Sequence, residues 1–164
     1  MSDSRPLSPP ADLVASLRRT SSDLASLVAE LPAGEVTPSR PGDDWSAAEV
    51  VAHLAHFEVL AGARIRMVLT LDRPPLAAFE QEEFNRRFAD LLRLDVALTL
   101  FQVNRGANCD LLGRLVAADW ERIGVHPVRG EETLARSMAM LVRHDREHLD
   151  QLRGAAATTS VRGR

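Results

Sequence analysis

Apolar residues recur along most of this chain at intervals of three and four, which is the spacing of one face of an α-helix. A first helix is predicted from Asp12, and Pro32 and Gly34 end it. Its apolar face consists of Leu13, Leu17, Leu24, Leu27, Val28 and Leu31. The residues before it, 1–11, contain three prolines and no long apolar run, so we expect a disordered tail there.

A second helix is predicted from Ser46 to about Leu71. Ser46 followed by Glu49 is a capping box, and Pro74 and Pro75 prevent the helix from continuing. The residues that share its inward stripe are Val50, Leu54, Phe57, Ala61, Ile65 and Val68.

A long connection at residues 72–94 follows, with a short helix expected at Phe79–Phe88. Two more long helices come after it. The third, from about Asp95 to near Ala118, carries the apolar residues Val96, Leu100, Val103, Ala107, Leu111 and Leu115. The fourth begins after Gly130 and ends at about Arg153, with Leu134, Met138, Leu141, Leu149 and Leu152 turned inward.

No segment alternates apolar and polar residues in the manner of a strand. Residues 120–127 are expected to be a loop, because Gly124 and Pro127 disfavour a helix. We therefore predict an all-α four-helix bundle that forms a single domain over residues 12–153, followed by a disordered tail at 154–164. No apolar run approaches membrane-spanning length, so no membrane association is expected.

The charge and composition of the chain limit which kinds of partner it is expected to bind. The chain has 20 basic and 23 acidic residues, a net charge of −3 and no tyrosine. Because it lacks a basic stripe with aromatic platforms, nucleic-acid binding is not expected. A single cysteine, Cys109, cannot form an internal disulfide, and no signal-peptide pattern is present, so we expect a cytoplasmic protein.

Three histidines stand on inward helical stripes. His144 and His148 are four residues apart on the fourth helix, so both imidazoles can reach one point. His53 lies three residues after Val50 on the buried stripe of the second helix. Three imidazoles that converge are a metal-ligand set, and the structural alternative is a group of core histidines hydrogen-bonded to one another and to water.

The positions of these histidines along their helices constrain the topology. His53 is about seven residues from the start of its helix, and the midpoint of His144 and His148 is about seven from the end of theirs, or roughly 10 Å in each case at 1.5 Å per residue. They meet only if the two helices are antiparallel. The connection at 72–94 can provide this by crossing the length of the bundle, which makes the topology up-down-down-up.

Segments 45–54, 120–130 and 144–152 together resemble the DinB-like family of bacterial four-helix proteins. The resemblance covers residues 12–153. It implies an up-down-down-up bundle with a divalent metal on His53, His144 and His148. It also implies frequent homodimers, and relatives that use low-molecular-weight thiols such as bacillithiol or mycothiol, as S-transferases or as a thiol-dependent isomerase.

Other polar residues have two interpretations each. His56 could approach the same site, but a position at the helix boundary is favoured. His126, before Pro127, is expected to fix the turn into the fourth helix. Arg105 and Asn108 could line the metal cavity, although a position on the flank facing water is slightly preferred.

The remaining candidates are acidic residues and the cysteine. Asp145, Glu147 and Asp150 could orient a ligand imidazole by accepting its second N–H, but solvated charges on an outer face are expected instead. Cys109 is expected to be a small helix residue rather than a nucleophile.

Three neutral imidazoles leave a bound ion with its full charge and an open position, as in catalytic sites. Together with the thiol-using relatives that the resemblance implies, this favours metal-activated transfer of a low-molecular-weight thiol to a small electrophilic substrate. Metal-dependent hydrolysis is the alternative reaction, and a metal-stabilised bundle that binds a small molecule or a partner is the non-enzymatic alternative. Zinc is the expected ion, with nickel or iron as alternatives.

Overall fold

The protein is described here by a computed structural model that covers residues 8–31, 45–78, 80–88 and 91–162. The predicted loop at 32–44, Phe79 and most of the expected N-terminal tail lie outside the described residues. None of the helices in the described part of the chain combines the length and apolar character needed to cross a membrane.

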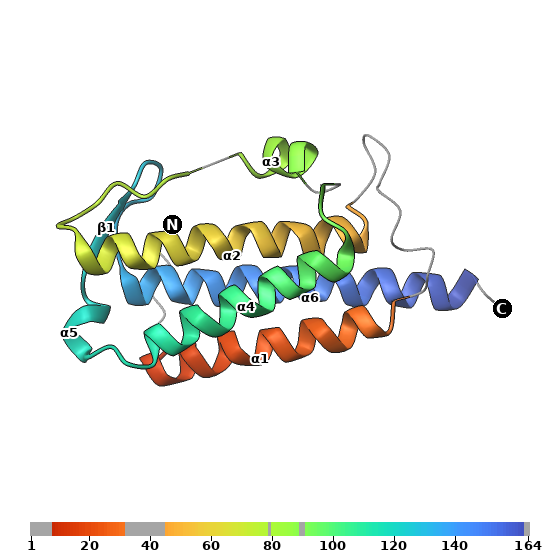
Figure 1. The fold of residues 1–164 in the computed structure, drawn as a ribbon, viewed down its shortest axis with the longest axis horizontal. Helices are drawn as coiled ribbons and strands as arrows, with labels where there is room; N and C mark the ends of the chain where they lie inside the picture. The colour runs from red at the N-terminus through yellow and green to blue at the C-terminus, as the bar shows by residue number, and fades with distance from the viewer. Residues whose placement is uncertain (1–7, 32–44, 79, 89–90, 163–164) are drawn as a thin grey trace.

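Four long helices pack side by side to form the bundle: α1 (Pro10–Ala29), α2 (Ala47–Thr70), α4 (Leu94–Leu112) and α6 (Leu134–Arg162). α1 and α6 run in one direction, and α2 and α4 run in the other (Figure 1). The segment after α2, which contains α3 (Gln81–Phe88), returns along the bundle to the end where α2 began. This crossover confirms the predicted up-down-down-up topology, because it starts α4 parallel to α2.

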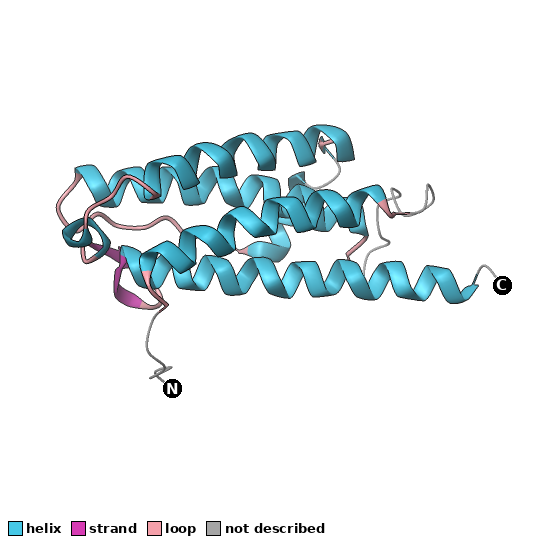
Figure 2. Cartoon of the chain, turned by 90° about the horizontal axis from the view of Figure 1, so that it is seen from below, coloured by secondary structure: helices cyan, strands magenta, loops and turns pink. Residues whose placement is uncertain are grey.

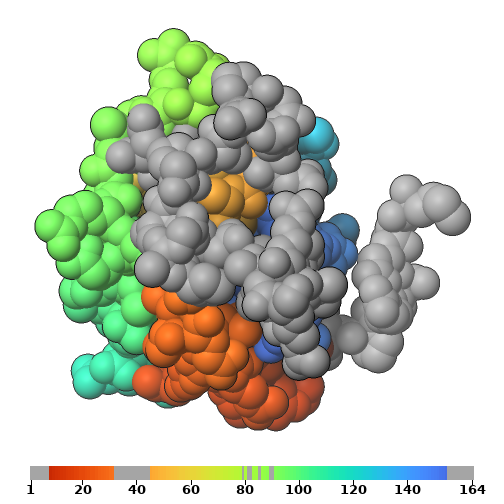
Figure 3. Space-filling model, turned by 90° about the vertical axis from the view of Figure 1, so that its right-hand side faces the viewer, coloured from red at the N-terminus to blue at the C-terminus, as the bar shows by residue number. Residues whose placement is uncertain are grey.

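The helices form two layers rather than a row. A view from below shows the helices lying alongside one another, with a small strand region at one end (Figure 2). The end-on view shows α1 below, α4 on the left and α6 on the right, with α2 visible between them (Figure 3). α2 therefore contacts both α4 and α6, which is the adjacency that the histidines require.

Two features of the segment between α4 and α6 differ from the sequence prediction. α4 ends at Leu112 rather than near Ala118, and the single turn α5 (Ala117–Trp120) follows. The predicted loop then forms β1 (Ile123–His126), which pairs antiparallel with β2 (Gly130–Thr133). These strands have four residues each, too few for an alternating pattern to be recognised.

The ends of α6 and α1 also differ. α6 begins at Leu134, immediately after β2, and continues to Arg162, whereas the pattern placed its end at about Arg153. α1 begins at Pro10, where a proline is favourable because the first helical N–H has no partner in any case. At α2 the prediction is confirmed, since Ser46 and Glu49 form the capping box.

The hairpin anchors the start of the crossover. The backbone N–H of Leu76 donates to the carbonyl of Val125 over 2.8 Å, and the N–H of Val125 donates to the carbonyl of Pro74 over 2.9 Å. Because these bonds fix the chain just beyond α2, the crossover leaves the bundle at a defined point. The hairpin thus helps to build the wall of the cavity described below.

The buried face of α4 is not its most apolar stripe. Val96 and Val103, which belong to the apolar stripe in the sequence, are 47% and 66% exposed. The face that packs inward consists of Ala97, Phe101, Arg105, Asn108, Cys109 and Leu112. The expectation that Arg105 and Asn108 face water is therefore wrong, and the reason is a set of buried ionic partners that no periodicity reveals.

Candidate metal centre

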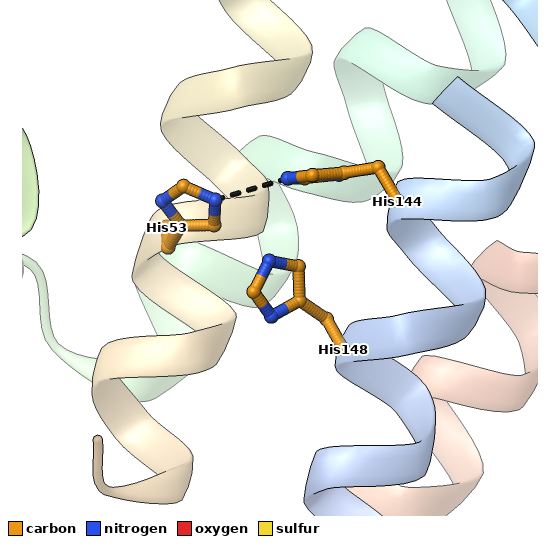
Figure 4. Close-up of side chains that lie close together, drawn as sticks. All are labelled: His53, His144 and His148. Atoms are coloured by element: carbon orange, nitrogen blue, oxygen red, sulfur yellow. Dashed lines mark hydrogen bonds between the residues drawn. The ribbon is translucent and has the colours of Figure 1, made fainter. Parts of the chain in front are cut away.

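His53 on α2 faces His144 and His148 on α6, and all three imidazoles point into one space (Figure 4). The Nε2 atoms of His53 and His144 are 3.1 Å apart. One nitrogen from each of the three rings lies within 4.8 Å of the others. The structure thus brings together the three histidines that the sequence selected, and among the described residues they are the group suited to hold a metal.

Local helix geometry explains this convergence. The α6 pair is separated by four residues, so the two rings lie about one turn apart, with centroids 4.6 Å from each other. The capping box at Ser46 fixes where α2 starts, and His53 follows two turns later. Since α2 and α6 are antiparallel neighbours, His53 meets the α6 pair at the same height (Figure 4).

The three rings differ in burial and in the partners of their second nitrogens. His53 is 1% exposed, and burial, reinforced by the neighbouring histidines, lowers its pKa to about 3. Burial also lowers the pKa of His148. The Nδ1 of His148 is 3.1 Å from the Oε1 of Gln151, and a proton on Nδ1 donated to this oxygen would leave the Nε2 lone pair available for a metal.

Two aromatic side chains hold these imidazoles in place. The indole of Trp45 stacks parallel to His148 at 5.9 Å and contacts His53 at 4.9 Å. On the other side, Phe57 stacks on His144 with ring centroids 4.2 Å apart. Rings packed in this way have little freedom to rotate, so the site is preorganised.

The donor set fits a divalent ion. Zinc binds imidazole nitrogen at about 2.0–2.1 Å, so two nitrogens on one ion lie roughly 3.0–3.4 Å apart. The 3.1 Å between His53 and His144 falls within this range. The Nδ1 atoms of His53 and His144 are buried and have no hydrogen-bond partner among the described residues.

A cavity of about 550 Å³ opens beside the cluster and reaches it at His144. Its apolar wall includes Phe57, Ile65, Leu76, Met138 and Leu141. Its polar groups come from α2, the crossover, the hairpin and α6: Arg64, Glu80, His126, Arg129, Glu132, Ser137, Arg143 and Glu147. The space has the size and the mixed lining of a small-molecule site.

The other histidines do not join the cluster. His56 is half-buried and packs edge-on against Phe84 of α3 at 5.4 Å, and burial lowers its pKa. This agrees with the predicted boundary position. The Nδ1 of His126 accepts hydrogen bonds from the backbone N–H groups of Val128 and Arg129. His126 therefore fixes a turn, but this is the turn between β1 and β2 rather than the predicted turn into the fourth helix, and the residue also lines the cavity.

A second polar cluster lies deeper in the bundle. The guanidinium of Arg105 donates to Glu58 on α2 and to Asp145 on α6, both over 2.7 Å, and to the carbonyl of Leu17 on α1 over 3.1 Å. Burial alone would lower the pKa of Arg105, but the carboxylates of Asp145 and Glu58 raise it above its ordinary value. One α4 side chain therefore ties all four helices together.

Asp145 links this ionic cluster to the histidines, and its predicted outer position is wrong. It is 1% exposed, and although burial opposes its charge, His144 and Arg105 hold its pKa below the ordinary value. Its Oδ1 lies 3.7 Å from the Nδ1 of His144, longer than a hydrogen bond. Glu147 and Asp150 are exposed, as predicted.

Sequence reasoning missed Glu58 and the packing of Trp45 against His53 and His148. Glu58 lies between Leu54 and Ala61 on the buried stripe of α2, so a carboxylate interrupting an apolar face was the available signal. Cys109 is buried, and burial raises the pKa of its thiol, which agrees with a packing role.

The fold is that of a known family. Residues 16–152 match the DinB superfamily, and the chain belongs to this family. A candidate metal-dependent hydrolase of Oceanobacillus iheyensis is 24% identical over 126 residues, which cover 77% of this chain and 73% of the relative. Another, from Bacillus mycoides, is 27% identical over 143 residues, 87% of this chain and 79% of the relative.

Solved structures show the same architecture. YfiT from Bacillus subtilis, described as a candidate metal-dependent hydrolase with an unusual four-helix bundle topology, superposes with a TM-score of 0.85 at 20% identity. The alignment covers 98% of this chain and 93% of YfiT. A mycothiol-dependent maleylpyruvate isomerase superposes with a TM-score of 0.70 at 15% identity, over 88% of this chain and 61% of that protein. At these identities the likeness defines the fold.

Proposed function

We propose that this protein is a metal-dependent hydrolase whose divalent ion is held by His53, His144 and His148. The observation that carries the proposal is the convergence of three imidazole nitrogens within 4.8 Å, beside a cavity of about 550 Å³. The relatives named as candidate metal-dependent hydrolases support the reaction type. From the sequence alone, thiol transfer is favoured and hydrolysis is the alternative; with these relatives, we prefer hydrolysis.

The ligand set suits catalysis because it is neutral and incomplete. Three imidazoles add no negative charge and leave at least one coordination position for water or substrate. When bound there, a divalent ion lowers the proton affinity of a coordinated water and polarises a substrate carbonyl. Imidazole accepts several divalent metals, and zinc is the ion we expect.

Glu147 is the carboxylate best placed to accept a proton during hydrolysis. It lies three residues after His144 on α6, which puts the two side chains on neighbouring positions of one face, and both line the cavity. Its contact with Arg143 is long, at 3.8 Å, and leaves it accessible. Glu132, by comparison, is held by Arg129 and Ser137.

Thiol-dependent chemistry is the second candidate. It is supported by the fold likeness to the mycothiol-dependent isomerase and by the lack of a protein thiol at the site, since Cys109 is fully buried. In that case the cavity would hold both a low-molecular-weight thiol and an electrophilic substrate. A homodimer and a cytoplasmic location stay predictions.

Elemental analysis of the purified protein beside the His148→Ala variant tests the proposal first. We expect about one divalent ion per wild-type chain and almost none in the variant. Hydrolysis of a panel of p-nitrophenyl esters and anilides is then measured for the metal-loaded, chelated and reloaded protein. Turnover that is lost on chelation and regained on reloading supports a hydrolase.

Two outcomes contradict the proposal. If the wild-type protein contains no metal and fails to take up added Zn²⁺ or Ni²⁺, the proposed metal site is wrong. The metal-loaded protein could also hydrolyse none of the panel but consume mycothiol or bacillithiol with an electrophile such as monochlorobimane. That result contradicts the hydrolase and supports the thiol-dependent alternative.

A further inference from the structure

The cavity beside the histidine cluster contains three arginines with different surroundings. Arg129 donates two hydrogen bonds to Glu132, at 2.8 and 2.9 Å, and Arg143 lies 3.8 Å from Glu147. Arg64 has no carboxylate within salt-bridge distance among the described residues. It is therefore the cation of this cavity whose charge no neighbouring side chain neutralises.

Glu132 cannot serve as that counter-ion. Its Oε2 accepts from the Nε of Arg129, and its Oε1 accepts from both Arg129 and the hydroxyl of Ser137. Burial, together with the positive charge of Arg129, lowers the pKa of Arg64, and Glu132 opposes this only in part. An arginine nevertheless stays charged at neutral pH, so Arg64 keeps a positive charge without a paired carboxylate, although the three arginines and three glutamates of the lining balance overall.

The donors of Arg64 are only partly used. One Nη2–H donates to the carbonyl of Ala77, which holds the guanidinium against the crossover. Its Nε is buried and has no hydrogen-bond partner among the described residues. A buried donor without a partner costs free energy, which an anionic ligand in the cavity would recover.

Arg64 and the histidine cluster lie on the same side of α2. Phe57 lies between them: its ring stacks on His144 at 4.2 Å, and the guanidinium carbon of Arg64 lies 5.9 Å from its centre. From Phe57 to Arg64 is seven residues, roughly 10 Å along the helix axis. A small molecule with an apolar body could therefore reach both.

From this arrangement we propose that the cavity binds a substrate with a carboxylate, that Arg64 holds this carboxylate, and that the reacting bond lies near His144. The inference rests on the proposed function for the reaction, but the anion site itself requires no metal. The apolar wall of Ile65, Leu76 and Met138 would accept the body of the substrate.

The test compares hexanoate with its neutral isostere hexanamide, both titrated into the full-length protein and followed by calorimetry and NMR. Wild-type protein is used as purified and after chelation, so that carboxylate binding to a metal is separated from binding to Arg64. We expect hexanoate to bind at least about tenfold more tightly than hexanamide in both states.

The Arg64→Met variant should lose this preference by about tenfold, while Arg64→Lys retains part of it because the charge remains. Arg143→Met is the matched control: it removes another arginine of the same cavity and should change hexanoate affinity less than about twofold. Thermal melts of the variants verify folding, and Arg64→Lys keeps the test decisive if Arg64→Met is unstable.

Equal hexanoate affinity in wild type and a folded Arg64 variant would overturn the proposal. So would a preference for hexanoate that disappears on chelation, or no saturable binding below about 10 mM. A protein that holds no metal but keeps the Arg64-dependent preference contradicts the proposed hydrolase while leaving the anion site intact.

Discussion

His144 and Asp145 are neighbours in the sequence, yet they belong to two polar clusters with opposite properties. His144 joins a cluster of three imidazole rings that borders a cavity. Asp145 joins a buried ionic cluster with Arg105 and Glu58, in which the charges are paired over 2.7 Å. Adjacent helical residues point about 100° apart, which allows this separation.

The two polar clusters of this bundle are therefore expected to have different roles, one in binding and the other in folding. The ionic cluster is buried and contacts all four helices, so its disruption should affect folding. The histidine cluster is incomplete and borders open space, so its disruption should affect binding. Changes that affect only one cluster test this distinction.

The largest effect is expected from His144→Ala. Two remaining histidines rarely hold an ion, so metal content should fall below about a tenth of the wild-type value, and hydrolysis should disappear with it. Metal analysis and circular dichroism measure the two properties. His126→Ala is the matched control, because His126 lines the same cavity but lies outside the cluster. Full metal content in His144→Ala would contradict the assignment.

Arg105→Met should destabilise the protein by about 3–5 kcal/mol, because Glu58 and Asp145 would remain buried without a counter-ion. Urea unfolding monitored by circular dichroism measures the change. Arg143→Met, at an exposed position, should cost less than about 0.5 kcal/mol. A loss below about 1 kcal/mol for Arg105→Met would show that the ionic cluster does not hold the helices together.

Removing all three charges should be less damaging than removing one. In the triple variant Glu58→Leu, Arg105→Met and Asp145→Leu, no unpaired charge is buried, so its free energy of unfolding should exceed that of Arg105→Met alone. The same urea experiment measures both variants. A strictly additive loss would indicate that each charged residue stabilises the bundle independently.

Chelation should have a moderate effect on stability. At an ion concentration a hundred times the Kd, binding adds about 2.7 kcal/mol, which corresponds to roughly 5–10 °C in Tm for a chain of this size. Differential scanning calorimetry with and without a chelator measures the shift. The His144→Ala variant should show no shift, and a shift that persists in it would place the stabilising ion elsewhere.

The smallest effect is expected from His56→Ala. This histidine packs on Phe84 and lies outside the histidine cluster, so we expect a loss of about 1 kcal/mol and unchanged metal content. Metal analysis is the decisive measurement. A clear loss of metal from a folded His56→Ala protein would extend the site beyond three histidines.

The sequence by itself determined the helices and the path of the chain. The period of apolar residues marked α1, α2 and α6, and Ser46 with Glu49 marked the start of α2 within one residue. His53 and the His144–His148 pair could be combined only in an up-down-down-up bundle. These inferences succeed because helix spacing and capping are local properties of the chain.

Tertiary structure alone decided which polar residues are buried. Arg105 and Asn108 lie inside because Glu58 and Asp145 approach them from two other helices, and such pairing leaves no periodic trace in any one helix. Among the arginines of the cavity, Arg64 is distinguished from Arg129 and Arg143 by the lack of a carboxylate within salt-bridge distance in the described part of the chain. Burial and charge compensation depend on distances between elements, which local sequence patterns do not encode.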